Sequence, residues 1–261
     1  MEKKILLTFD LEEFDLPFEF GCPISDQDQI NVTNNGLKRL TVLLAEYNIP
    51  ATFFTTAFYA EKNKELIKSL SLTHEIASHS NQHSGFKQTD LLDSKSKIEG
   101  ITGKQVYGFR MPRFQKIDMA IIKAAGYRYD SSINPTFIPG RYNNIFTRRK
   151  MYRDISSNLI EIPVSVSPVI RFPLFWLSFK NISLPLYLHM CKMAIQKDFY
   201  LNLCFHPWEF DDLDSFNVPR YVKNISGKLY FERFEKMIER LLEIADFSTI
   251  SDFLESLASS C

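Results

Sequence analysis

The segment Ile5-Leu6-Leu7-Thr8-Phe9-Asp10-Leu11-Glu12-Glu13 decides the fold, because an apolar run passes directly into acidic residues. A short, nearly continuous apolar run predicts a strand that is buried on both faces, as in a parallel sheet. Further segments of the same character lie at 51–55, 75–78, 106–109, 160–164 and 200–205. The opening segment is therefore expected to be the first of a set of parallel strands.

Amphipathic helical patterns separate the predicted strands. Leucines recur at helical spacing over 37–44, isoleucines over 117–122 precede Gly126, and the strongest apolar stripe runs over 231–242. Alternation of strands and helices predicts a parallel sheet with right-handed crossovers, either closed into a barrel or left as an open doubly wound sheet. Because the chain has neither a GxGxxG turn nor a Walker A motif, the common nucleotide-binding folds are excluded.

The composition and the charge narrow the class of protein. The chain has 31 basic and 31 acidic residues, and only Arg148-Arg149-Lys150 forms a basic run, so no nucleic-acid partner is expected. Its four cysteines lack CxxC spacing, which is typical of a reduced compartment and argues against a cysteine-based zinc site. Neither a signal peptide nor a membrane-spanning apolar run is present, so the expected location is the cytoplasm.

Ionisable residues follow the C-terminal ends of four predicted strands. They are Asp10 and Glu12 after the first strand, His79 and His83 after the third, Arg110 after the fourth, and His206 after the last. In parallel α/β folds these ends share one rim, which is where active sites are built. The six side chains are therefore expected to converge although they lie far apart in the sequence.

These residue types match the chemistry of a metal-dependent hydrolase. Two histidines four residues apart and one carboxylate give the three protein ligands of a catalytic zinc or iron site. Such a hydrolase needs a base, which Asp10 or Glu12 could provide, and an acid, which His206 could provide. Arg110 would keep the base ionised. Taken singly, each residue has a plainer explanation: a capping Asp, a solvated HxxxH face or a surface ion pair.

The ordered set resembles the polysaccharide deacetylase family, the carbohydrate esterases built on the NodB homology domain. The matching segments are Thr8-Phe9-Asp10-Leu11-Glu12, His79-Ser80-Asn81-Gln82-His83, Arg110-Met111-Pro112, Tyr129-Asp130-Ser131-Ser132 and Leu203-Cys204-Phe205-His206. The resemblance covers most of the chain. It implies a single domain over 1–261 that forms a distorted (β/α) barrel with about seven parallel strands. It also implies a hydrolase that removes N-acetyl groups from an N-acetylated carbohydrate, either a polysaccharide or a lipid-linked sugar.

The resemblance further implies a role for each matched residue. His79 and His83 are expected to be metal ligands, Asp10 the catalytic base, Arg110 its partner, His206 the acid, and Asp130 an acidic residue that supports the site. The first motif departs from the commonest pattern, in which two adjacent aspartates supply the base and a metal ligand, because Leu11 stands in the second place. Strand alternation favours Glu12 as the third ligand, with Glu13 as the alternative. The expected cofactor is a divalent metal, most simply zinc.

An apolar stretch near 170–190 interrupts the alternation of strands and helices. It is expected either to cover the barrel as a buried excursion or to make a peripheral contact with a membrane or a lipid-linked sugar. His74 and His189 are predicted to bind no metal. Two other functions stay open, namely a C–N hydrolase of a small or cyclic amide and a non-catalytic carbohydrate-binding relative. The sequence does not indicate the oligomeric state.

Overall fold

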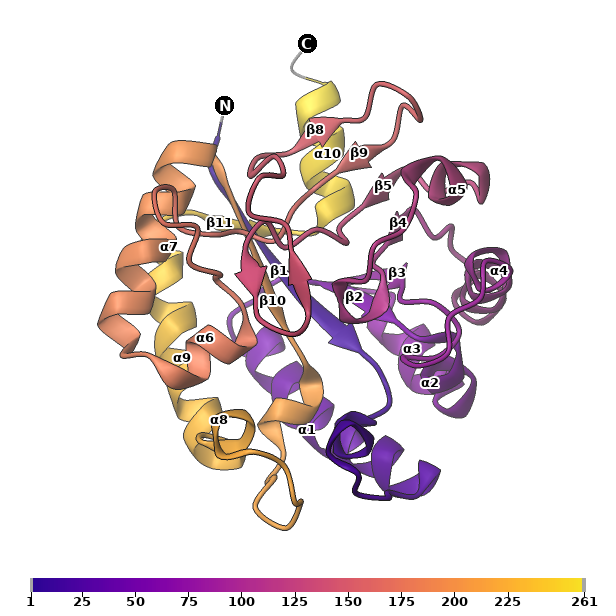
Figure 1. Cartoon of the computed structure of the whole chain (residues 1–261), viewed down its shortest axis with the longest axis vertical. Helices are drawn as coiled ribbons and strands as arrows, with labels where there is room; N and C mark the ends of the chain where they lie inside the picture. Colours follow the sequence, from indigo (N-terminus) through magenta and orange to yellow (C-terminus); the bar gives the residue numbers. More distant parts are fainter. Residues whose placement is uncertain (1, 260–261) are drawn as a thin grey trace.

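Figure 1 shows the computed structural model of the chain, in which residues 2–259 are described. The strands of the central sheet are β1 (Lys4–Leu11), β2 (Thr52–Thr55), β3 (Glu75–Ser78), β4 (Gly108–Phe109), β5 (Tyr129–Asp130), β8 (Tyr152–Arg153), β9 (Ile160–Glu161), β10 (Tyr200–Phe205) and β11 (Asp246–Ser248). Their hydrogen-bonded order is β10-β1-β2-β3-β4-β5-β9-β8, and β11 also pairs with β1. Each described pair in this sheet is parallel except that of β8 with β9.

The sheet curls into a distorted barrel (Figure 1). From β10 to β9 the strand order is entirely parallel, which confirms the predicted α/β barrel with about seven parallel strands. The two edges approach each other where the Ser165 N–H donates to the Asn202 carbonyl over 2.8 Å. A bridge between Phe175 and Cys204 adds a second link beside β10. Irregular segments, rather than a continuous ladder, therefore complete this side of the barrel.

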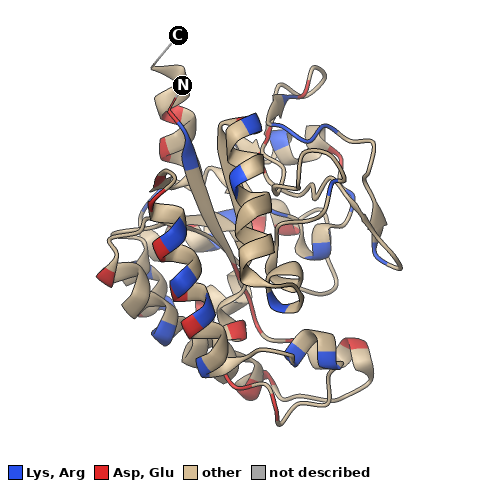
Figure 2. Cartoon of the chain, turned by 90° about the vertical axis from the view of Figure 1, so that its left-hand side faces the viewer, with Lys and Arg blue, Asp and Glu red and all other residues tan. Residues whose placement is uncertain are grey.

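Helices cover the outside of the sheet (Figure 1). They are α1 (Asp26–Glu46), α2 (Ala57–Lys62), α3 (Lys64–Leu70), α4 (Asp90–Thr102), α5 (Met119–Ala124), α6 (Trp176–Asn181), α7 (Leu184–Asp198), α8 (Arg220–Lys223), α9 (Gly227–Leu242) and α10 (Ile250–Ala258). The loops contain three short 3-10 helices, η1 (Leu16–Phe20), η2 (Pro112–Phe114) and η3 (Pro207–Phe210). They also contain a hairpin formed by β6 (Phe137–Ile138) and β7 (Tyr142–Asn143). Basic and acidic residues are mixed along the outer helices in Figure 2, as expected for solvated faces.

The central strand β1 shows why the acidic residues point where they do. Ile5, Leu7 and Phe9 belong to the large core between the sheet and the helices. Alternate residues point to the opposite face, so Thr8 and Asp10 are directed to the barrel interior, where both accept a hydrogen bond from Arg110. The alternation that the sequence predicts thus places the carboxylate of Asp10 inside the barrel.

The predicted elements agree with the structure where the sequence pattern is long. The strands predicted at 75–78 and 200–205 have the same bounds in β3 and β10, and the stripe over 231–242 lies in α9. The strand predicted at 160–164 is shorter, because Pro163 has no N–H with which to continue a ladder. The helix predicted over 37–44 begins earlier, at Asp26, where Ser25 accepts a hydrogen bond from the Asp28 N–H and caps the helix.

Helix α1 packs closely against η3, which follows β10. The contact is made at Gly36, where a Cβ atom would lie only 1.9 Å from the carbonyl oxygen of Pro207. Real Cβ atoms do not approach a backbone oxygen so closely. A glycine is therefore required at this position if η3 is to keep its place.

The apolar stretch over 170–190 forms α6 and the beginning of α7. Phe175, Phe179 and Tyr187 are buried, whereas Ile170 and Leu186 are exposed. Trp176 is half-buried and lines the cavity described below. Most of the stretch thus covers the open side of the barrel, which is the first of the two expectations for it.

Two further observations concern the whole described chain. Among the helices that residues 2–259 form, none combines the length and the apolar character required to cross a bilayer. Cys22, Cys191 and Cys204 are free thiols, and Cys261 lies outside the described residues.

Candidate metal and catalytic site

The loop that follows β3 places His79 and His83 at the C-terminal rim of the sheet. The His79 N–H continues the ladder by donating to the Thr55 carbonyl, and Ser80 then adopts a left-handed conformation with φ 70. The carbonyls of Ser80 and Asn81 accept hydrogen bonds from the first turn of α2. A tight loop, rather than a helix, therefore brings the two histidines together.

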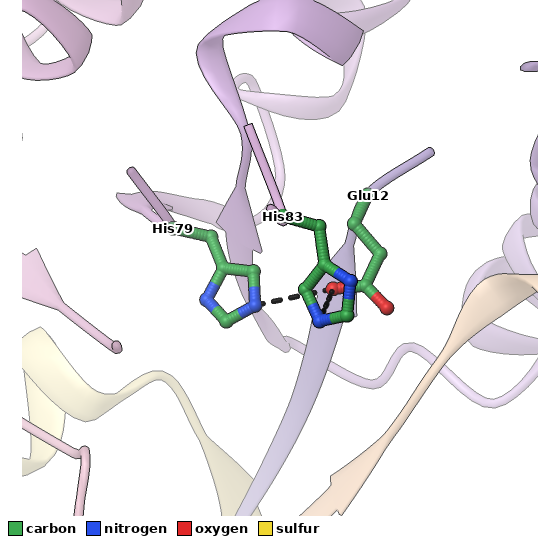
Figure 3. Close-up of side chains that lie close together, drawn as sticks. All are labelled: Glu12, His79 and His83. Atoms are coloured by element: carbon green, nitrogen blue, oxygen red, sulfur yellow. Dashed lines mark ion pairs between the residues drawn. The ribbon is translucent and has the colours of Figure 1, made fainter. Parts of the chain in front are cut away.

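Glu12, His79 and His83 form a cluster whose ligand atoms all lie within 4.8 Å of one another (Figure 3). The Nε2 atoms of His79 and His83 lie 3.1 and 3.2 Å from Oε2 of Glu12. Because the Nδ1–H of His79 donates to the Arg110 carbonyl over 2.8 Å, its Nε2 carries a lone pair when the ring is neutral. That lone pair faces a carboxylate oxygen, and two such acceptors repel each other unless a cation lies between them.

The hydrogen-bond inventory of the cluster also fits a metal ion. Oε2 of Glu12 and Nε2 of His79 are buried and have no hydrogen-bond partner among the described residues. Buried polar atoms without a partner are rare and are often explained by an ion. Two imidazoles and one carboxylate suit zinc and related divalent ions. Glu12, His79 and His83 could therefore hold a divalent metal.

Glu13, the alternative third ligand, points away from the cluster. One of its oxygens accepts from the His83 N–H over 2.8 Å, and the other accepts from the Thr56 hydroxyl over 2.7 Å. Both carboxylate oxygens are thus used to hold the loop that carries His83. Glu13 therefore supports the loop, and Glu12 is the carboxylate that lies in the candidate metal cluster.

Asp15 orients His83 from behind. Its Oδ1 accepts from Nδ1–H of His83 over 2.6 Å, which leaves Nε2 facing Glu12. Burial opposes the charge on His83, but Glu12 and Asp15 outweigh burial and raise the pKa of His83 to about 9. Asp15 also pairs with Arg113 over 3.0 Å. Second carboxylates of this kind fix the tautomer of a metal-binding histidine, and the sequence pattern alone did not point to this one.

We expect Asp15→Asn to weaken the binding of a divalent metal by about 10- to 100-fold, the usual cost of losing such a partner. The amide still accepts a hydrogen bond but no longer supports His83 with a negative charge. The measurement is a competition titration of zinc against a chromophoric chelator. Ser84→Ala is the matched control, because the Ser84 hydroxyl donates to Oδ2 of Asp15, whereas the His83 ring is held by Oδ1. Equal affinity in wild type and Asp15→Asn would contradict this role.

Asp10 is held by Arg110 inside the barrel. Nη1 of Arg110 donates to Oδ1 of Asp10 over 2.7 Å, and its guanidinium is fully buried, stacked 4.0 Å from the Phe54 ring centroid. Burial opposes ionisation of Asp10, but Arg110, with smaller effects from His79 and His206, lowers its pKa to about 2. Oδ2 of Asp10 faces Nε2 of His79 at 3.9 Å. A carboxylate with a lowered pKa thus lies beside the candidate metal cluster.

His206 faces the same space from β10. Its Nε2 lies 3.9 Å from Oδ2 of Asp10 and 3.8 Å from Oε1 of Glu12. On the other side of the ring, Nδ1–H donates to Oε1 of Glu209 over 2.9 Å, and the same oxygen accepts the His206 N–H. Burial opposes a charge on His206, but the bond to Glu209, together with Glu12 and Asp10, raises its pKa. The imidazole is therefore suited to carry and deliver a proton.

Trp208 and Glu209 are site residues that the motif analysis did not assign. Trp208 stacks on the His206 ring with centroids 4.6 Å apart, and its indole N–H donates to Glu12 over 3.3 Å. The only signal in the sequence was their place directly after His206 in His206-Pro207-Trp208-Glu209. This position alone does not identify Trp208 as a site residue, because a Trp after a strand is more often a core residue.

Asp130 is buried at the end of β5 but does not line the cavity beside the cluster. Burial raises its pKa to about 6. Its carboxylate accepts from the Ser132 hydroxyl, which in turn accepts from the Met111 N–H over 2.8 Å. Through Ser132 it thus supports the loop after Arg110, and it also interacts with the buried carboxyl of Glu161. The carboxylate that accepts a hydrogen bond from His206 is Glu209. His74 is half-buried against Phe53 and His189 is exposed, both away from the cluster.

A cavity of about 310 Å³ adjoins the cluster. Asp10, Glu12, His83 and His206 line one part of it, and its other walls are largely apolar and aromatic. The aromatic lining residues are Phe20, Phe114, Tyr142, Phe175, Trp176, Trp208 and Tyr221. The β6–β7 hairpin and α6 both contribute to these walls. A cavity that joins aromatic walls to a few ionisable groups is the usual form of a small-molecule site.

Comparisons with known proteins agree with the geometry. The family model described as Polysaccharide deacetylase matches residues 1–129. A peptidoglycan deacetylase of Helicobacter pylori (strain ATCC 700392 / 26695) is 26% identical over 156 residues, which cover 50% of this chain and 53% of that protein. The chain thus aligns with only about half the length of this curated relative.

Solved structures share the fold over nearly the whole chain. A candidate polysaccharide deacetylase from Mycobacterium smegmatis superposes with a TM-score of 0.67 at 18% identity, covering 100% of this chain and 92% of that one. The allantoinase PuuE superposes with a TM-score of 0.63 at 13% identity, covering 95% and 88% of the two chains. At such identities the likeness establishes the barrel architecture.

Proposed function

This chain belongs to the polysaccharide deacetylase family, and from that premise we propose that it is a metal-dependent hydrolase that removes N-acetyl groups from an amino-sugar substrate. The observation that carries the proposal is that three metal-ligand candidates, a charged carboxylate and a carboxylate-paired histidine lie together beside one cavity. A protein that only binds sugar has no need of all these groups together. The activity, the substrate and the zinc ion are parts of the proposal.

The metal would be held by Glu12, His79 and His83. When bound there, a divalent ion supplies Lewis-acid polarisation of the acetyl carbonyl and of a water molecule. The protein holds the lone pairs of the two histidines toward one point through the Arg110 carbonyl and Asp15. This fixed donor geometry is the contribution of the chain to metal binding.

Asp10 would act as the general base. Its carboxylate is charged at neutral pH, lies next to the ligand cluster and lines the cavity. A base must be able to reach the water that attacks the amide carbon. Arg110 keeps Asp10 ionised and fixes its orientation through a 2.7 Å hydrogen bond. The low pKa of Asp10 makes it a weak base in isolation, so the reaction depends on the water being acidified.

His206 would act as the general acid. Its Nε2 points into the cavity, and its Nδ1 is held by Glu209. Cleavage of an amide produces an amine leaving group, which must receive a proton as the C–N bond breaks. The raised pKa of His206 allows the ring to hold that proton near neutral pH. The products are acetate and a free amino sugar.

The proposal predicts that the purified protein, supplied with zinc, releases acetate from an N-acetylglucosamine oligosaccharide or a peptidoglycan fragment. The peptidoglycan fragment is chosen because the curated relative is a peptidoglycan deacetylase. Acetate and new free amines are measured together, and a chelator is expected to remove both signals because the metal is needed to polarise the carbonyl. Metal-independent opening of a cyclic amide, without acetate release, would instead favour the C–N hydrolase alternative.

A further inference from the structure

Lys180 is a buried cation that the proposed reaction does not use. It lies in α6, within the apolar excursion, and its side chain is completely buried. Lysine is almost never fully buried unless its charge is compensated. Burial lowers the pKa of Lys180 to about 8, so it still carries its proton at neutral pH.

The contacts of Lys180 lead directly to the catalytic histidine. Its Nζ donates to the Val222 carbonyl over 2.7 Å and lies 3.9 Å from Oε2 of Glu209. That separation is too long for a hydrogen bond, so the link to Glu209 is charge attraction in a dry environment. The ammonium also lies 5.6 Å from the ring centroid of Trp208, which stacks on His206.

Glu209 needs such a counter-charge. It is completely buried, its Oε2 makes no hydrogen bond of ordinary length among the described residues, and the only neutral donor that interacts with it there is the buried Tyr230 hydroxyl. Its other oxygen holds both the ring and the backbone N–H of His206. The ammonium of Lys180 lies on the Oε2 side of this carboxylate and the His206 ring lies on the Oε1 side, so attraction from α6 helps to fix the orientation of Glu209.

We propose that Lys180 is a positioning residue for the general acid: its buried ammonium attracts Oε2 of Glu209 and fixes that carboxylate, and Glu209 in turn holds the His206 ring in its proton-donating orientation. The inference rests on the proposed deacetylase function and extends it to the excursion, which supplies the charge. Helix α6 touches the acid a second time through Trp176, whose ring packs edge-on against His206 at 5.3 Å. The excursion is thus a working part of the catalytic centre in addition to a cover for the barrel.

A comparison of two substrates tests this role. An N-acetyl amino sugar needs protonation of its leaving amine, whereas the nitrophenolate of para-nitrophenyl acetate leaves without a proton. Lys180→Met keeps the apolar stem and removes the charge. We expect it to lower kcat for the amide by about 10- to 100-fold, a part of the usual contribution of a general acid. Ester hydrolysis should stay within about threefold of wild type, because its leaving group does not depend on the acid.

A double-mutant cycle separates this role from a loss of folding. Lys180→Met leaves Glu209 as an unpaired buried charge, which destabilises proteins, whereas Lys180→Met/Glu209→Gln removes both charges. If Lys180 acts through Glu209, the double variant should have the same amide-to-ester ratio as Glu209→Gln alone. Arg233→Met is the matched control, because Arg233 donates to the Phe179 and Ile182 carbonyls and holds α6 without contacting Glu209. Its ratio should equal that of wild type.

Failure of the Lys180 role and failure of the deacetylase proposal give different results in these experiments. A wild-type amide-to-ester ratio in Lys180→Met, or additive losses in the double variant, would overturn the positioning role while leaving the deacetylase proposal intact. A wild-type protein that hydrolyses the ester but no N-acetyl sugar would overturn the proposed function, and the inference with it.

Discussion

Asp10→Asn is expected to lower kcat for acetate release by about 10²- to 10⁴-fold, the usual contribution of a general base. Asparagine has the same shape and can still accept the hydrogen bond from Arg110, but it cannot take a proton from water. KM is expected to change little, because in the proposed mechanism the metal cluster and the cavity walls would hold the substrate. Initial-rate measurements of acetate over a range of substrate concentrations separate the two parameters.

Asp130→Asn is the natural comparison for Asp10→Asn. Both carboxylates are buried at the ends of parallel strands, but Asp130 does not line the cavity. We expect less than about a tenfold loss, since the hydrogen bonds from Asp130 through Ser132 reach the site only at the backbone of Met111. Thermal unfolding of both variants must be recorded, because Arg110 loses its buried counter-charge in Asp10→Asn. Wild-type kcat in folded Asp10→Asn would remove Asp10 from the mechanism.

Removal of one candidate metal ligand is expected to abolish the binding of a divalent ion. Wild-type protein should bind about one divalent ion per chain, and His83→Ala should lose it, measured by elemental analysis after gel filtration. Zinc at about 100 times its Kd should stabilise wild type by about 2.7 kcal/mol against unfolding, and the variant by almost nothing. His189→Ala, which removes an exposed histidine from α7, is the control. One ion per chain in His83→Ala would contradict the assigned ligand set.

Metal binding should also depend on pH in a defined direction. In the metal-free chain the pKa of His83 is raised to about 9, so at neutral pH its ring is protonated. Zinc must displace that proton, and its apparent affinity should therefore rise by about tenfold per pH unit until the pH reaches the pKa. Calorimetry in buffers of different ionisation enthalpy measures the number of protons released.

Much of the fold could be predicted because its longer strands carry a clear apolar pattern. β1, β2, β3 and β10 each contain at least four residues and were recognised from that pattern alone. β5, β8 and β11 contain only two or three residues, which is too few for periodicity to be visible. Such short strands are formed by their neighbours in the sheet and not by local preference.

The six rim residues could be chosen from the sequence because parallel strands place their C-terminal ends on one edge. Their partners could not be chosen in this way. Asp15 reaches His83 from a loop before η1, and Glu209 reaches back to His206 across one turn of η3. Lys180 comes from the apolar stretch over 170–190, where the sequence has no motif or spacing that would connect a lysine to the site. These contacts depend on loop geometry and side-chain rotamers, which the residue types alone do not determine.

The contact at Gly36 has a consequence for how natural variants of this chain should be interpreted. η3 carries both Trp208 and Glu209, and it can lie against α1 only while residue 36 has no side chain. A single methyl group at that position would displace the support of the proton donor. A substitution at this position could therefore abolish the activity of the site while every ionisable residue at the rim is kept. A homologue that keeps every motif but has a larger residue at this position is expected to have lost most of its catalytic activity.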